Sequence, residues 1–356
     1  MHHEVVEAGH RHENREIPMA HLLKLGLAAA WTASLLVANA TFAAQSTCEK
    51  IAGVQLAACK AEASDDSLNA KAICLNLASK VERAECTNNA RADANETKHL
   101  CREQNDSRED LCEALGENFY APDFDPAGFE QDFSGLQHPN LYFPLATGNR
   151  WEYEGPGEMI SIEVLAKTKQ IEGVTCEVVR DVVSNAGQPV EDTDDWFGQR
   201  DDGSVFYCGE ISRSFEVFPG DDPEEAELVG IDGSWKAGRD GALPGVVFPG
   251  TPVVGAVYRQ ELARGDAEDA AEVLSTTYAY GSNATLDAFV PAALAQTLCA
   301  NGDCIVTREF TPISPDHFER KYYARGVGLF LEVNPEDGEV VTLTQCNFAA
   351  VCDKLD

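Results

Sequence analysis

The sequence predicts an α+β protein whose helices and strands are separated by domain. We expect an N-terminal disulfide-stapled α-helical hairpin or bundle, followed by an antiparallel all-β sandwich, half-barrel or barrel. Three observations support this expectation. Residues 44–118 contain no proline and are rich in Ala, Glu, Asp, Lys and Asn. Short strand-like runs punctuated by Gly, Pro and Asp begin at Asn140, and all 12 cysteines lie beyond residue 43.

The first 43 residues have the pattern of an export signal behind an upstream extension. After Met19, Lys24 supplies a positive charge, residues 25–37 form an apolar run, and Thr41-Phe42-Ala43 places small residues at positions −3 and −1 of a cleavage site. We expect cleavage after Ala43 and no membrane span in the mature chain. The expected regions are 1–43 (upstream extension and signal peptide), 44–118 (Cys-rich helical domain), 119–139 (linker) and 140–356 (antiparallel β domain).

The charge and the cysteines restrict the partners and the compartment. The chain has 27 Lys and Arg against 60 Asp and Glu, a formal net charge of −33. Loss of residues 1–43 removes three basic and four acidic residues, which leaves 24 against 56, or −32. We expect no nucleic-acid partner for so acidic a surface. An even number of cysteines without C-x-x-C indicates disulfides, and therefore a secreted protein, either periplasmic or extracellular.

The six cysteines of the helical domain are regularly spaced. Ten or eleven residues separate Cys48 from Cys59, Cys74 from Cys86, and Cys101 from Cys112. Such a spacing is about three helical turns, so each pair is expected on one helix face about 16 Å apart, too far to bond within the pair. Breaks at residues 64–67 and 88–89, and Gly116 as the residue that closes the last helix, favour three helices.

Disulfides between such antiparallel helices have two nested arrangements. We favour Cys86–Cys101 with Cys74–Cys112, which leaves Cys48 and Cys59 irregular. The alternative is Cys59–Cys74 with Cys48–Cys86. We expect the segment to act as a rigid arm, or as a module for docking or homo-oligomerisation.

The linker and the β region have their own signals. Residues 119–139 contain three prolines and five aromatics, which we expect to pack on the β domain. Local proximity favours Cys176–Cys208, Cys299–Cys304 and Cys346–Cys352. Residues 284–298 are expected to contain a short helix. The expected strands are 150–154, 159–167, 174–183, 195–199, 204–209, 253–262, 271–280, 304–310, 318–323, 328–333 and 339–345.

The two ends of the β region carry distinctive motifs. Residues 141–155 read L-Y-F-P-L-A-T-G-N-R-W-E-Y-E-G, and residues 321–332 read K-Y-Y-A-R-G-V-G-L-F-L-E. In these motifs the chain resembles a widespread group of uncharacterised exported bacterial β-rich proteins, here with an N-terminal Cys-rich helical segment. The resemblance covers residues 141–343. It implies an exported protein with a β fold, and it brings no catalytic residues with it.

The segment from Glu191 to Glu210 is the richest in candidate chemistry, with seven carboxylates and four aromatics around Cys208. An EF-hand that starts at Asp192 is excluded, because Trp196 and Phe197 stand where a ligand oxygen and a glycine are required. The pattern favours a β-hairpin that turns at residues 200–203. The other hypothesis is a cation site, for calcium above all. Its ligands would be Glu191, Asp192, Asp194 and Asp195.

No enzyme motif is present. The sequence contains no G-x-S-x-G, P-loop, dinucleotide-binding or H-E-x-x-H pattern. We therefore expect a non-enzymatic binding or envelope-associated protein whose β domain takes a small-molecule or carbohydrate ligand, with no cofactor except calcium. The alternative is a secreted, carboxylate-dependent and calcium-dependent hydrolase. That enzyme would use Glu191, Asp192, Asp195 or Glu210.

Two further patterns have structural interpretations. Trp151, Trp196 and Trp235 are expected in the core of the β domain rather than in a sugar-stacking platform. The acidic run at residues 220–227 is expected to form an exposed loop.

Overall fold

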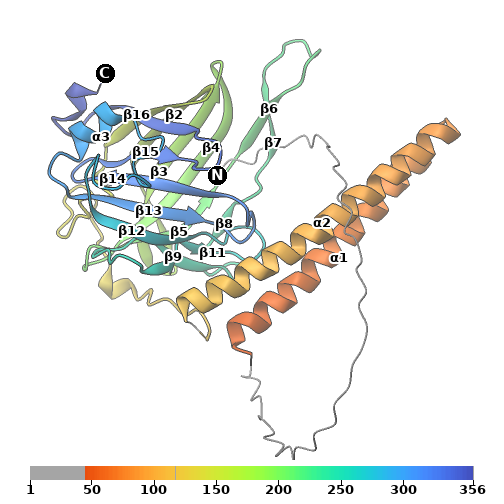
Figure 1. The fold of residues 1–356 in the computed structure, drawn as a ribbon, viewed down its shortest axis with the longest axis horizontal. Helices are drawn as coiled ribbons and strands as arrows, with labels where there is room; N and C mark the ends of the chain where they lie inside the picture. Colours follow the sequence, from red (N-terminus) through yellow and green to blue (C-terminus); the bar gives the residue numbers. More distant parts are fainter. Residues whose placement is uncertain (1–44, 117, 356) are drawn as a thin grey trace, which may run out of the picture. The chain divides into compact units, whose positions relative to one another are not determined.

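Two long antiparallel helices begin the described part of the structure. The computed structural model describes residues 45–116 and 118–355, so the expected signal peptide lies outside the described residues. Helix α1 spans Thr47–Leu75 and begins with a capping box between Ser46 and Glu49. Helix α2 spans Lys80–Leu115 and ends at Gly116, whose φ of 61° is the left-handed conformation expected there. Figure 1 shows the two helices side by side.

The expectation of three helices was wrong, and so were both disulfide arrangements proposed for them. Helix α1 continues through residues 64–67, and the chain reverses between Leu75 and Lys80. The reversal places the two helices in a single hairpin. It also falls between Cys74 and Cys86, so the expectation that these two lie on one helix, too far apart to bond, was wrong. The bonds are Cys48–Cys112, Cys59–Cys101 and Cys74–Cys86, three nested pairs that are each centred on residue 80.

The positions of these cysteines explain the correct pairing. Along each helix the three cysteines are separated by 11 and 15 residues, which is about three and about four turns. All three therefore lie on one face of their helix and meet the matching face of the other helix. The disulfides compensate for sparse apolar packing, because the described core residues of α1 are Cys48, Ala52, Ala63 and Cys74.

The remainder of the chain forms one large antiparallel sheet that is nearly barrel-shaped (Figure 1). The strand order is β10-β12-β13-β14-β15-β16-β1-β2-β3-β4-β5-β9-β11, with β6, β7 and β8 off this path. The bounds are β1 Arg150–Gly155, β2 Glu158–Ile171, β3 Val174–Asn185, β4 Gln188–Gln199, β5 Val205–Ile211, β6 Ser214–Val217, β7 Ala226–Gly230, β8 Trp235–Lys236, β9 Leu243–Phe248, β10 Val257–Arg259, β11 Glu261–Leu262, β12 Ala270–Tyr278, β13 Cys304–Phe310, β14 Phe318–Ala324, β15 Gly328–Val333 and β16 Val340–Cys346.

One short run of chain joins the two edges of this sheet. Strand β10 is the first in the strand order and β11 is the last, yet only Gln260 separates them in the sequence. The first half of the run pairs with β12, and the second half pairs with β9. The edges of the sheet are thereby brought together, which removes most of the exposed edge that an open sheet would carry.

The interior and the surface elements match several expectations. Trp151, Trp196 and Trp235 are buried, and the loop at residues 220–225 is exposed. Phe129 and Phe133 of the expected linker are buried and pack on the β domain as expected, whereas Phe119 of the same segment is 63% exposed. Helix α3 (Ala292–Leu298) is the short helix expected in the β region. Two short 3-10 helices, η1 (Pro126–Gly128) and η2 (Cys352–Lys354), complete the elements.

The three local disulfides expected in the β region are confirmed. Cys299–Cys304 and Cys346–Cys352 close short loops, and Cys176–Cys208 joins β3 to β5 with β4 between them rather than bridging adjacent strands. With the three in the hairpin, they pair all twelve cysteines, as is typical of proteins that fold outside the cytoplasm. None of the described helices is long and apolar enough to cross a membrane.

Candidate functional site

The hairpin expected from the Glu191–Glu210 segment is present as β4 and β5. Its turn is closed by two backbone hydrogen bonds, from Arg200 N to Ser204 O at 2.8 Å and from Gly203 N to Arg200 O at 2.9 Å. Gly203 has a φ of 85°, a conformation that favours glycine. The turn residues that predicted this hairpin from the sequence therefore also form its turn in the structure and fix the register of the two strands.

Strand alternation separates the four carboxylates of the expected cation site. Asp192 and Asp194 lie on one face of β4, where Arg180 binds Asp192 through two hydrogen bonds of 2.9 and 2.6 Å and Arg213 lies 3.7 Å from Asp194. Glu191 and Asp195 lie on the opposite face, because successive side chains of a strand alternate. The structure therefore brings the four carboxylates together in two pairs rather than around one point.

Asp195 belongs to a buried polar group on the inner face of the sheet. Tyr207 on β5 donates a 2.5 Å hydrogen bond to Asp195 Oδ1, and Glu210 lies directly opposite Asp195 in the β4–β5 pairing. The pairing shifts register at Gly209, where an added Cβ would lie 2.5 Å from Trp235 O. Glycine at this position therefore allows β8 to approach closely and to pair with β5 at Gly209 and Glu210.

The segment after β10 adds two more acids from the far edge of the sheet. Glu261 lies in β11 and is fully buried, and Asp269 lies just before β12. Neither carboxylate oxygen of Glu261 has a hydrogen-bond partner, and Trp235 Nε1 beside it does not reach hydrogen-bond geometry. The charged groups that act most strongly on Glu261 are Asp269, Glu210 and Asp195. Closure of the sheet thus creates this concentration of acids.

We use the name interior acidic cluster for Asp181, Asp195, Glu210, Glu261 and Asp269. The negative charge of Glu332 on β15 contributes to raising the pKa of Asp181 on β3. These strands are not neighbours in the sheet, so the two side chains interact across the interior. Asp181, Asp195 and Asp269 are half-buried, whereas Glu210 and Glu261 are buried. Solvent therefore reaches the three aspartates of the cluster but is largely excluded from its two glutamates.

Burial raises the pKa of every member of the cluster, because a carboxylate loses hydration there. Burial and the Glu210 carboxylate raise the pKa of Asp195 to about 8, against the opposing hydrogen bond from Tyr207. Burial also raises the pKa of Asp181 to about 8, that of Glu210 to about 7 and that of Asp269 to about 6. The pKa of Glu261 is raised well above its ordinary range by burial and then by Asp269 and Glu210.

A basic side chain near the cluster, that of Lys321, forms ion pairs with a different set of acids. Burial lowers the pKa of Lys321, but attraction from Glu332, Glu309 and Glu319 outweighs it and raises the pKa overall. Its ammonium lies 3.4 Å from Glu309 and 3.6 Å from Glu332. By contrast, no Lys or Arg side chain is among the largest influences on Asp181, Asp195, Glu210 or Glu261. Within the described residues, these four members of the cluster therefore have no basic side chain among their main electrostatic partners, whereas Lys321 lowers the pKa of the fifth, Asp269, against the larger effect of burial.

A metal ion fits another part of the described chain better than the cluster. Among the described residues, Glu130, His138 and Asp201 form a group whose ligand atoms all lie within 4.8 Å of one another, and no three carboxylates of the cluster lie so close together. His138 Nδ1 lies 3.2 Å from Glu130 Oε1, and His138 and Asp201 are exposed. The cluster carboxylates are thus too widely spaced to surround a single ion.

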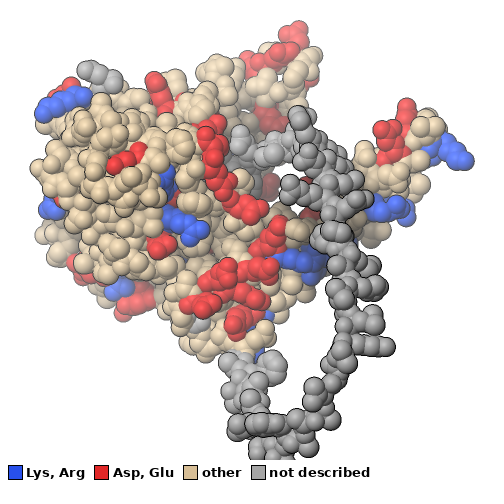
Figure 2. All heavy atoms as spheres, in the orientation of Figure 1, with Lys and Arg blue, Asp and Glu red and all other residues tan. Residues whose placement is uncertain are grey.

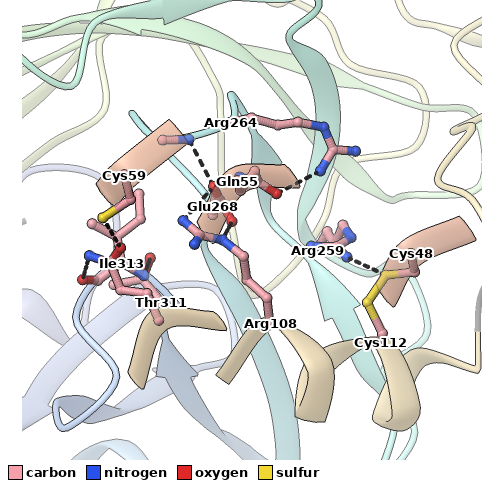
Figure 3. A network of polar contacts seen from close by, with 12 residues as sticks. Cys48, Gln55, Cys59, Arg108, Cys112, Arg259, Arg264, Glu268, Thr311 and Ile313 are labelled. Carbon is pink, nitrogen blue, oxygen red and sulfur yellow. Dashed lines mark hydrogen bonds and ion pairs between the residues drawn. A yellow bond between two sulfur atoms is a disulfide. The ribbon is translucent and has the colours of Figure 1, made fainter. Parts of the chain in front are cut away.

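The segment that supplies Glu261 and Asp269 also holds the helical hairpin (Figure 3). Glu268, which is buried, accepts hydrogen bonds from Arg108 of α2 at 2.7 and 3.0 Å and from Gln55 of α1 at 2.6 Å. Gly265 N adds a further bond at 2.8 Å. Gln104 of α2 donates to Ile313 O at 2.8 Å. Nine residues of chain thus connect the hairpin to the interior acids.

Sequence reasoning found part of this site and missed the rest. Asp195 and Glu210 stood out because they lie in an acid-rich hairpin. Asp181, Glu261 and Asp269 did not, because each is one acid among many. A usable signal was present in V-Y-R-Q-E-L-A (257–263), where a glutamate interrupts a strand-like run that has to be buried.

Comparisons with known proteins add little to this description. No protein-family model matches the chain, and no curated protein sequence matches it. A solved structure from Parabacteroides distasonis, described as a putative lipoprotein, is similar with 12% sequence identity and a TM-score of 0.28. The match covers 59% of this chain and 100% of that chain. So distant a likeness carries no argument about function.

Proposed function

We propose that this protein is an exported, envelope-associated binding protein, and that the inner face of its β sheet takes a small organic cation. The observation that carries the proposal is the Glu261 carboxylate, which is fully buried without a hydrogen-bond partner and is surrounded by other acids. A buried carboxylate in this condition is costly unless it is protonated or meets a positive charge.

The spacing of the cluster supports an organic cation over a metal ion. Its carboxylates line the interior without three oxygens close enough to share one ion. An ammonium or guanidinium group on a carbon chain reaches several separate carboxylates, and its N–H groups match their acceptors. Asp181, Asp195 and Asp269 are only half-buried, so solvent and a ligand can contact these members of the cluster. Export is supported by the six disulfides.

Thermal unfolding with a series of alkyl diamines and alkylguanidines tests the proposal. We expect a saturable rise in Tm, which corresponds to about 2.7 kcal/mol at a hundredfold excess over Kd. The double variant Glu210→Gln/Glu261→Gln should lose the rise. The matched control Glu227→Gln, on the exposed strand β7, should keep it. A series without any saturable rise, or a rise that the double variant retains, contradicts the proposal.

A carboxylate-dependent hydrolase is the second candidate, and one observation favours it. Asp195 and Glu210 lie opposite each other, with pKa values raised by burial to about 8 and about 7. A carboxylic acid that stays protonated near neutral pH is what general-acid catalysis requires. Screening against polysaccharides and esters, with Asp195→Asn as the comparison, separates the two candidates. Turnover that Asp195→Asn abolishes supports the enzyme.

A further inference from the structure

The closed end of the helical hairpin exposes apolar side chains. We use the name hairpin tip for residues 68–83. Within it Leu68, Ile73, Leu75 and Val81 are 66%, 68%, 67% and 75% exposed. Exposed apolar residues are ordinary when they are scattered, but these four lie close to the chain reversal between α1 and α2. Ile73 also lines a hollow of about 410 Å³, together with the acidic residues Glu82, Glu85 and Asp93. The Cys74–Cys86 disulfide holds this end together, so the exposed side chains are not needed to close it.

The charge of the hairpin tip is opposite to that of the chain. The tip contains three basic residues (Lys71, Lys80, Arg83) against one acidic residue (Glu82), a net charge of +2 in a chain of −33. The nearest further charges, Asp66 and Glu85, lie just behind it. Figure 2 shows acidic side chains spread over much of the face in view. The tip therefore combines apolar and positive groups on a protein that otherwise repels anions.

The hairpin is long enough to separate this tip from the acidic β domain. The hairpin residues described above as contacting the β domain are Gln55, Gln104 and Arg108, which lie between the open end of the hairpin and the Cys59–Cys101 disulfide. From Cys59 to Leu75 the helix rises about 24 Å. This is about three Debye lengths at physiological salt. The acidic domain is thus largely screened from a surface that the tip touches.

We propose that the hairpin tip docks on an anionic lipid bilayer. Basic residues near such a surface are attracted to its headgroups, and exposed apolar side chains partition into the interfacial region. A second copy of the chain fits less well, because a stable protein interface needs roughly 20–30 residues on each side. The tip offers only seven suitable side chains at the end of two helices. Contact between two tips would also bring like charges together.

Vesicle flotation of the full, oxidised chain tests this docking. Vesicles of phosphatidylcholine with and without phosphatidylglycerol are compared, and we expect binding only to those with phosphatidylglycerol. Ile73→Ser/Val81→Ser should lower the bound fraction about tenfold, and so should Lys71→Glu/Lys80→Glu. The matched control is Val54→Ser, which changes an equally exposed apolar residue of α1 (70%) outside the tip. All these positions are exposed, so unchanged Tm values confirm that each variant is folded.

Three results would overturn the docking proposal. Wild-type protein that floats with neither kind of vesicle contradicts it directly. Binding that survives both tip variants places the contact elsewhere on the chain. Self-association in sedimentation velocity that the tip variants abolish, without any flotation, identifies a second copy as the occupant. None of these results depends on whether the β domain binds a cation.

Discussion

Raising the pH from 5 to 8 is expected to destabilise this protein, and Asp195 accounts for a defined part of the effect. Its pKa is raised from an ordinary value of 3.8 to about 8 by burial and by Glu210. Between these two values the folded state binds more protons than the unfolded state. Stability is therefore greatest at low pH and is lost as the pH rises through the folded pKa.

The size of the effect follows from the pKa shift. Each pH unit within the window costs about 1.4 kcal/mol per group, so three units cost about 4 kcal/mol for Asp195 alone. Asp181, Glu210 and Asp269 are shifted in the same direction, and the five acids interact, so their losses do not simply add. A loss of about 4 kcal/mol is a large part of the 5–15 kcal/mol that stabilises a typical domain.

Urea unfolding at pH 5, 6.5 and 8 measures the effect, with Asp195→Asn as the test variant. The asparagine cannot ionise, so we expect the variant to lose about 4 kcal/mol less than the wild type across this range. Asp194→Asn is the matched control, because Asp194 is the next residue of β4 but lies on the opposite face near Arg213. Its pH dependence should equal that of the wild type.

Two results would refute the reasoning. Wild-type stability that is flat or rises between pH 5 and 8 shows that Asp195 is not held protonated in the folded state. An equal slope in the wild type and in Asp195→Asn shows that other groups carry the pH dependence.

The remaining predictions concern the hairpin. Arg108→Met leaves the Glu268 carboxylate buried with only Gln55 and Gly265 as donors, and we expect a loss of about 3 kcal/mol in urea unfolding, partly recovered by Arg108→Met/Glu268→Met. A loss below about 1 kcal/mol would show that this ion pair does not anchor the hairpin. Removing Cys48–Cys112 or Cys74–Cys86 should cost a similar amount, about 3 kcal/mol each, although their sequence separations are 64 and 12. Cys59–Cys101 already shortens the outer loop, so a difference above about 1 kcal/mol between the two, again by urea unfolding, would argue against the chain-entropy explanation.

Local signals predicted the elements whose geometry depends on adjacent residues. The turn at residues 200–203, the left-handed Gly116 and the disulfide Cys299–Cys304 are each determined by a few neighbouring residues. The break expected at residues 64–67 was wrong for a related reason. Ser and Asp are poor helix formers in isolation, but the disulfides on either side, Cys59–Cys101 and Cys74–Cys86, hold this part of α1 against α2.

The sequence alone determined the separation into helical and β parts, the use of the cysteines as disulfides, and the acidic character of the surface. Each depends on composition, periodicity or short-range chemistry, which tertiary contacts modify only slightly. Which acids become buried neighbours was decided by the tertiary structure. Glu261 meets Asp195 only because the run from Val257 to Leu262 joins the two edges of the sheet, and no local property of either residue encodes that contact. The same closure places Glu268 under the hairpin, so the site and the position of the arm both follow from long-range strand pairing.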